Sequence, residues 1–123
     1  MKQNLLTIFA VLLLGGNAVS QTARVQVIHN AADAAASVVD VYLNGEILIN
    51  DFAFRTASSF VNAPAGTPIT IVVAPGNSTS ATEGIYTLTT TLTANETYVI
   101  VASGIVSTSG YSPNQAFQLY PYA

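Results

Sequence analysis

The chain has 123 residues, of which 50% are hydrophobic and 7% are charged, and its formal net charge at pH 7 is −3. It contains no cysteine, which excludes disulfides, a thiol nucleophile and thiolate metal sites. Lys and Arg together number three against six Asp and Glu, so the chain lacks the clustered basic side chains that bind nucleic acid or anionic membrane surfaces.

Residues 1–20 have the features of a signal peptide, which we expect to form a helix. Lys2 supplies a positive start, residues 5–14 supply an apolar segment, and Ala18-Val19-Ser20 supplies small residues for cleavage. An apolar segment of that length is too short to cross a bilayer core of about 30 Å as a helix. We therefore expect a secreted protein (extracellular, at the cell surface or in the periplasm), with no membrane insertion after signal removal and one domain over residues 21–123.

The first strands are predicted on either side of an alanine-rich loop. Residues 24–29 and 38–43 alternate apolar and polar side chains, the period-two pattern of half-buried strands. Asn44-Gly45 follows the second run and precedes Glu46 and the apolar residues Ile47-Leu48-Ile49. This dipeptide readily adopts positive φ at both central turn positions, so it predicts a tight hairpin.

Later segments add further strands. Residues 69–74 are apolar on both faces and predict a central strand, whereas residues 85–92 alternate Tyr or Leu with Thr. Asn95 marks a tight turn before a well-covered strand at 97–102, and residues 116–120 predict the closing strand.

Seven or eight short strands with no helical period after the signal indicate an all-β fold. We predict an antiparallel immunoglobulin-like β-sandwich, with a small barrel as the alternative. Two polar segments, Asn77–Thr82 and Ser103–Gln115, read as loops, and the second is long enough to be a candidate for function.

The order Arg-Val-x-Val-x-His, an Ala-rich loop with an Asp, and Val-Asp-Val-Tyr-x-Asn-Gly resembles the opening of the bacterial family called domain of unknown function 4397. Further matches are Phe52-Ala53-Phe54, Ala63-Pro64-Ala65-Gly66, and Leu92-Thr93-Ala94-Asn95 leading into Tyr98-Val99-Ile100-Val101-Ala102. The resemblance covers nearly all of the chain after residue 22. It implies an exported immunoglobulin-like domain, often in tandem copies, with no established activity. The chain has Ala32 and Ala35 where the family usually has prolines.

His29, Asp33 and Asp40 are the candidate reactive side chains. A hydrolase would pair His29 with Asp33 or Asp40 and take a nucleophile from Ser58 or Ser59. The same three residues could form a facial metal site. We favour a third interpretation, a structural loop cluster in which the His29 ring and Asp33 hydrogen-bond loop backbone, and we expect no catalytic residues, no metal and no cofactor.

The function that the composition favours is a non-catalytic module for adhesion, assembly or ligand binding. Its candidate binding residues lie in the two polar loops: Asn77, Ser78, Tyr111 and Asn114. Expected partners are an extracellular glycan or protein, or a second copy paired through strand edges. A carbohydrate-binding module is the alternative, and a hydrolase is the less favoured one.

Overall fold

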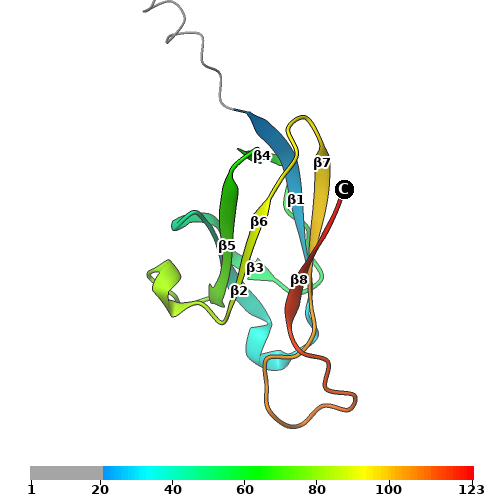
Figure 1. Ribbon diagram of the computed structural model, residues 1–123. Coiled ribbons are helices and arrows are strands. Elements are labelled where there is room, and N and C mark those ends of the chain that lie inside the picture. The colour runs from blue at the N-terminus through cyan, green and yellow to red at the C-terminus, as the bar shows by residue number, and fades with distance from the viewer. Residues whose placement is uncertain (1–20) are drawn as a thin grey trace, which may run out of the picture.

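The computed structural model describes residues 21–123, and the predicted signal peptide at residues 1–20 lies outside the described residues. The described chain forms two four-stranded sheets that face each other (Figure 1). Sheet A has the order β4-β1-β7-β8 and sheet B the order β3-β2-β5-β6. The strands are β1 (Thr22–Asn30), β2 (Val38–Leu43), β3 (Glu46–Ala53), β4 (Val61–Pro64), β5 (Pro68–Pro75), β6 (Tyr86–Thr91), β7 (Thr97–Ser103) and β8 (Gln118–Tyr122).

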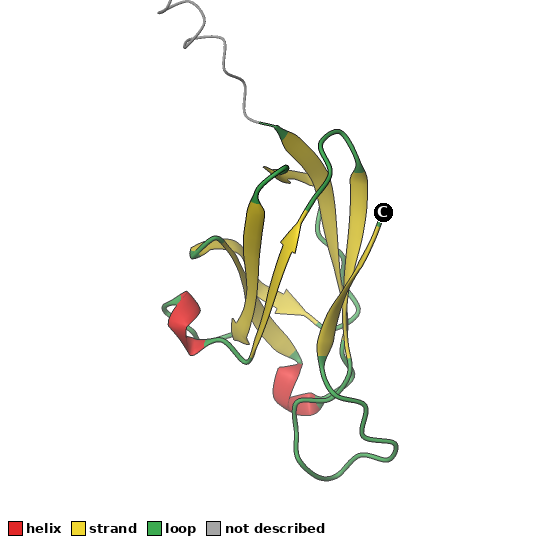
Figure 2. Ribbon diagram, in the orientation of Figure 1, coloured by secondary structure: helices red, strands yellow, loops and turns green. Residues whose placement is uncertain are grey.

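Two short 3₁₀ helices, η1 (Ala34–Ala36) and η2 (Ala81–Glu83), interrupt the connections between strands (Figure 2). The all-β sandwich of seven to eight strands is thus confirmed, and the two separate sheets set aside the alternative of a small closed barrel. Within residues 21–123, no helix has the length and apolar character needed to cross a bilayer.

One strand pair departs from the antiparallel pattern expected from the sequence. β1 pairs with β7 in parallel, with Val27 opposite Ile100, whereas every other pair among the named strands is antiparallel. A parallel pair needs a long crossover between its strands. Here the crossover is the whole of sheet B together with β4, a pairing that local sequence patterns cannot reveal.

The core lies between the sheets and follows the alternation of their strands. Val25 and Val27 of β1 are 2% exposed, while their neighbours in the strand are exposed or half-buried. Ile69 of β5 and Ile100 of β7 complete the centre of the core. Burial of such apolar side chains, at about 25 cal/mol per Å², is the main source of stability because the described residues contain no disulfide.

The Asn44-Gly45 hairpin forms as predicted between β2 and β3. Both residues have positive φ, 50° and 86°, which glycine and asparagine tolerate best. The Asn44 side-chain oxygen also accepts a 2.9 Å hydrogen bond from the Thr70 N–H of β5. The turn is therefore fastened to the neighbouring strand, and this fixes one wall of the site described below.

Several predicted strands are confirmed and one is shifted. β5 is central between β2 and β6, and β6 exposes Thr87, Thr89 and Thr91 while Tyr86, Leu88 and Thr90 are half-buried. The closing strand, predicted at 116–120, instead spans Gln118–Tyr122. The shift arises because residues 115–117 pair with Ile105 inside the long loop before the strand begins.

Candidate functional site

The outer face of sheet B carries the β2 side chains that point away from the core. Because side chains alternate along a strand, Val39 and Val41 enter the core while Asp40 and Tyr42 face outward. Both outward side chains are nevertheless buried, with 0% and 6% of their surface exposed. The expectation of a half-buried strand is wrong here because the β5–β6 connection folds over this face and packs Ala81 against it.

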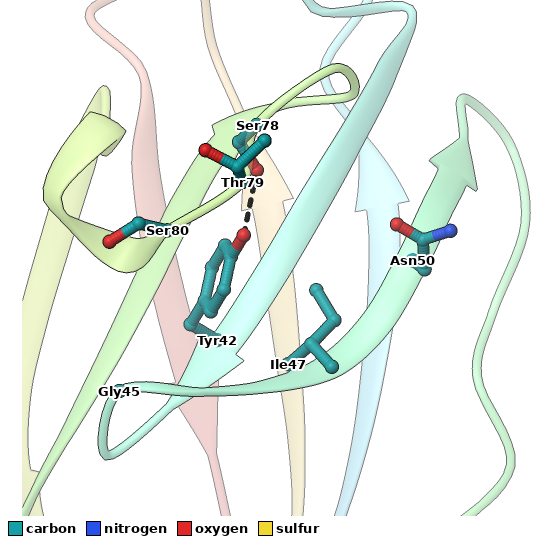
Figure 3. A pocket seen from close by; sticks show the side chains of 7 residues that line it. All are labelled: Tyr42, Gly45, Ile47, Asn50, Ser78, Thr79 and Ser80. Carbon is teal, nitrogen blue, oxygen red and sulfur yellow. Dashed lines mark hydrogen bonds between the residues drawn. The ribbon is translucent and has the colours of Figure 1, made fainter.

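A chain of hydrogen bonds ties that connection to β2. The Ser78 hydroxyl donates to Oδ2 of Asp40 at 2.5 Å, since a carboxylate can only accept. Ser78 has one hydroxyl hydrogen, so the 2.9 Å bond to Tyr42 is donated by the tyrosine (Figure 3). Oδ1 of Asp40 accepts from the Asp51 N–H at 2.9 Å. Asp40 therefore joins β2, β3 and the β5–β6 connection.

Glu83 fixes the connection from its other end. Its Oε2 accepts from the Thr79 N–H at 2.7 Å, from the Thr79 hydroxyl at 3.0 Å and from the Ser80 N–H at 3.0 Å. Ser80 and Glu83 also form a capping box on η2. The hydrogen bonds from Thr79 lower the pKa of Glu83, so the carboxylate and the folded loop stabilise each other.

An open pocket of about 420 Å³ lies between this connection and the β2–β3 hairpin (Figure 3). Its volume falls within the range of about 300–1,000 Å³ found for small-molecule sites. It is lined by Tyr42, Gly45, Ile47, Asn50, Ser78, Thr79 and Ser80. No lining side chain is charged, so the pocket offers hydroxyl, amide, aromatic and aliphatic groups. The nearest carboxylates, Asp40 and Glu83, lie behind this lining and accept from the Ser78 and Thr79 hydroxyls.

A second polar region lies at one end of the sandwich, where η1 meets the loop between β7 and β8 (Figure 1). Asp33 is 1% exposed and caps η1 by accepting from the Ala35 N–H at 2.9 Å. It also accepts from the Val106 and Ser107 N–H groups at 3.0 and 2.7 Å and from the Ser107 hydroxyl at 2.9 Å. One carboxylate thereby holds the long loop against the Ala-rich loop.

The hydrogen bonds at Asp33 also set its protonation. Burial alone would raise the pKa of this carboxyl, but bonds from Ala35, Ser107 and Tyr111 outweigh burial and lower the pKa from 3.8 to about 2. Asp33 is therefore ionised at neutral pH, with its negative charge compensated by donors of the protein itself.

His29 is fully buried at the end of β1, and both ring nitrogens have backbone partners. Nε2 lies 2.7 Å from the Ala36 carbonyl oxygen, and Nδ1 accepts from the Ala31 N–H at 3.3 Å. Since a carbonyl only accepts, Nε2 carries the proton and the imidazole is neutral. Burial lowers its pKa, against the opposing effect of the Ala36 carbonyl. The rings of Phe52 and Phe54 pack against it with centroids 5.7 and 5.9 Å away.

The hydrogen bonds of His29, Ser58 and Asp40 do not match the arrangement that the hydrolase and metal hypotheses require. The Ser58 hydroxyl donates to the Ser59 carbonyl and accepts from the Val27 N–H, and within residues 21–123 neither Ser58 nor Ser59 hydrogen-bonds His29. No group of three or more His, Cys, Asp or Glu residues in that range could hold a metal ion. The proposed cluster of His29, Asp33 and Asp40 is wrong for Asp40, because its neighbours in β2 face the core and it consequently points to the opposite side of sheet B.

The remaining sequence-predicted residues divide between the two regions. Ser78 lines the pocket, and Asn77 is exposed beside it. The Tyr111 hydroxyl accepts from the Ala34 N–H at 2.8 Å, and Asn114 donates to the Ser107 carbonyl at 3.4 Å. Both of these loop residues therefore take part in the Asp33 region rather than in the pocket.

Most of the pocket is not evident from the sequence. Tyr42 and Ile47 lie in predicted strands and Asn50 lies just beyond one, and none of the three is a candidate site residue on sequence grounds. One usable signal was present, an Asp and a Tyr at alternate positions of a strand directly before the Asn44-Gly45 turn. Which loop covers that face depends on strand order, which the sequence alone does not give.

A protein-family model described as "domain of unknown function (DUF4397)" matches residues 23–118. This range includes every strand from β2 to β7 and all the residues of both polar regions. A search of curated proteins found no match to the chain.

Proposed function

Since the chain belongs to the DUF4397 family, a domain class of unknown function, we propose that it is a non-catalytic, exported β-sandwich module that acts by binding through its surface. Export follows from the signal-peptide features of residues 1–20. The module works outside the cytoplasm, in the cell envelope or beyond it, and needs no cofactor.

The observation that carries this proposal is the contrast between engaged titratable groups and an open uncharged pocket. The buried polar residues of the described chain are His29, Asp33 and Asp40. Their side-chain polar atoms form hydrogen bonds with backbone groups or with the hydroxyls of Ser78 and Ser107. A catalytic group must instead reach a substrate atom. The pocket is open to ligand, yet its lining has no titratable acid or base other than the Tyr42 phenol.

The partner is an extracellular glycan or protein, and its contact region is the pocket with the adjoining Asn77–Thr82 segment. The Ser103–Gln115 loop is a weaker candidate because its polar groups already form hydrogen bonds within the protein, at Asp33, Tyr111 and Asn114.

One observation favours the alternative of self-association. Ile47, on edge strand β3, is 51% exposed, and an exposed apolar edge can pair with a second copy. Sedimentation velocity over a range of concentrations distinguishes the two.

A turnover screen tests the proposal against the hydrolase. The purified protein is incubated with ester, glycoside, peptide and phosphate substrates, in parallel with the variants His29→Gln and Ser58→Ala. We expect no turnover above the buffer control for any of the three proteins. Turnover that one of these substitutions abolishes, while the variant keeps the wild-type circular dichroism spectrum, would reject the binding module and establish an enzyme.

A further inference from the structure

We propose that the pocket between the β2–β3 hairpin and the β5–β6 connection binds a neutral saccharide; this inference rests on the binding function proposed above. It follows from three properties of the lining: the hydrogen-bonding atoms left free, the sign of the nearby charges, and the apolar surfaces beside the polar ones.

The free polar atoms of the pocket are mainly acceptors. The Tyr42 hydroxyl hydrogen is used on Ser78, so the tyrosine oxygen can only accept from a ligand. The Thr79 hydroxyl hydrogen is likewise used on Glu83, and its oxygen lone pairs remain. A ligand that fits must therefore supply hydrogen-bond donors.

Asn50 adds a third acceptor on the opposite wall. Its Nδ2 donates to the Asp51 carboxylate at 3.1 Å, which establishes the orientation of the amide because a carboxylate cannot donate. Oδ1 then has no hydrogen-bond partner within residues 21–123. Figure 3 shows Asn50 on β3 and Tyr42 on β2 on different sides of the pocket. Donors spaced along a ligand, as on a sugar ring, can reach both.

The surrounding charges exclude anions. Asp40 lies behind Ser78, Asp51 follows Asn50, and Glu83 holds Thr79. Among residues 21–123 the basic side chains belong to Arg24, which stacks on the Phe60 ring at 5.0 Å, and Arg55, and neither lines the pocket. An anionic ligand would have no partner and would meet three carboxylates.

A cationic ligand fits less well than a neutral one because no carboxylate lines the pocket itself. A cation taken out of water needs direct pairing with an anion to offset its lost hydration. A neutral saccharide has no such need. Its hydroxyls can donate to the free oxygens, and a C–H face can pack on Ile47, which is 51% exposed, beside the small part of Tyr42 that lines the pocket.

A glycan array carrying neutral, carboxylated and amine-bearing oligosaccharides tests the proposal. We expect the purified protein to bind neutral glycans and not the carboxylated ones. Affinity should stay within about twofold between roughly 0.05 and 0.5 M salt, because no ion pair contributes. Asn50→Ala should weaken binding about three- to tenfold through loss of an acceptor, and Tyr42→Phe should weaken it by a similar factor.

The matched control is Asn62→Ala, which removes the same amide from an exposed position on β4 of the other sheet and should leave binding unchanged. Thermal melts of all variants separate lost binding from lost folding. Absence of neutral-glycan binding, or binding unaffected by Asn50→Ala, overturns the saccharide site while leaving the non-catalytic module intact. A fall in affinity with salt would overturn it in favour of a cationic ligand. Catalytic turnover would instead overturn the module.

Discussion

The Asp33 region and the pocket face are built from the same kinds of residue, yet they differ in where their hydrogen bonds end. At Asp33 four donors from the chain converge on one buried carboxylate, and the long β7–β8 loop is fastened by it. At the pocket the carboxylate of Asp40 is buried too, but the chain of bonds through Ser78 ends on a tyrosine oxygen that faces an open space. A buried carboxylate alone therefore does not indicate a binding site. Polar atoms that face an open pocket without a hydrogen-bond partner indicate one better.

The largest effect is expected from Asp33→Ala, which leaves the N–H groups of Val106 and Ser107 without their partner. Buried donors without partners are costly, so Tm should fall by roughly 10 °C or more. Differential scanning calorimetry measures this. Asp33→Asn keeps one acceptor oxygen, so its Tm should lie between those of Asp33→Ala and the wild type. A wild-type Tm for Asp33→Ala would show that the carboxylate does not hold the loop.

Asp40→Ala should have a smaller and more local effect. The substitution leaves the Asp51 N–H and the Ser78 hydroxyl without an acceptor, and the cost should be about 1–3 kcal/mol in the free energy of unfolding. Urea denaturation measures it. Amide hydrogen exchange should rise in residues 76–84 of the β5–β6 connection and not in the Ser103–Gln115 loop. Equal acceleration in both loops would contradict the separation of the two regions.

Local features of the fold could be predicted from the sequence, but the contacts that form the two regions could not. The Asn44-Gly45 turn, the central position of β5 and the threonine face of β6 were predictable because each depends on neighbouring residues or on a period of two. The contacts that define the regions are not of this kind. Ser78 lies 38 residues from Asp40 in sequence, and Ser107 lies 74 from Asp33. Such pairs depend on sheet order and register, including the parallel β1–β7 pair, which no local pattern encodes.

Acid should destabilise the Asp33 end of the sandwich in two steps, in addition to the loss of the Glu83 contribution in the β5–β6 connection as pH falls below 4.5. The pKa of His29 is lowered from 6.5, so the unfolded chain binds this proton first and stability should fall as pH drops below 6.5. The pKa of Asp33 is lowered from 3.8 to about 2, so its contribution is present above pH 3.8 and is lost as pH falls toward 2.

Chemical denaturation at a series of pH values checks both steps. His29→Gln should lack the first step and Asp33→Asn the second, whereas the pocket variant Asn50→Ala should keep both. A wild-type profile that is flat from pH 7 to pH 2 would mean that these two groups have the same affinity for protons in the folded and unfolded chains.

The smallest effect on stability is expected from Tyr42→Phe. It removes one hydroxyl bond but leaves Ser78 donating to Asp40, so it should cost about 1 kcal/mol. The same substitution should clearly weaken saccharide binding, and this combination separates a ligand contact from a structural one.

Tyr111→Phe is the counterpart in the Asp33 region. It removes the acceptor for the Ala34 N–H and should lower stability by a similar amount without changing binding.

Chemical-shift mapping by NMR during titration with a neutral oligosaccharide selected on the array tests the contrast most directly. The account predicts shifts in the amides of Tyr42, Gly45, Ile47, Asn50 and Ser78–Ser80, and unchanged amides at Asp33, Val106 and Ser107. Shifts confined to the Ser103–Gln115 loop, or none at the pocket under saturating oligosaccharide, would contradict it.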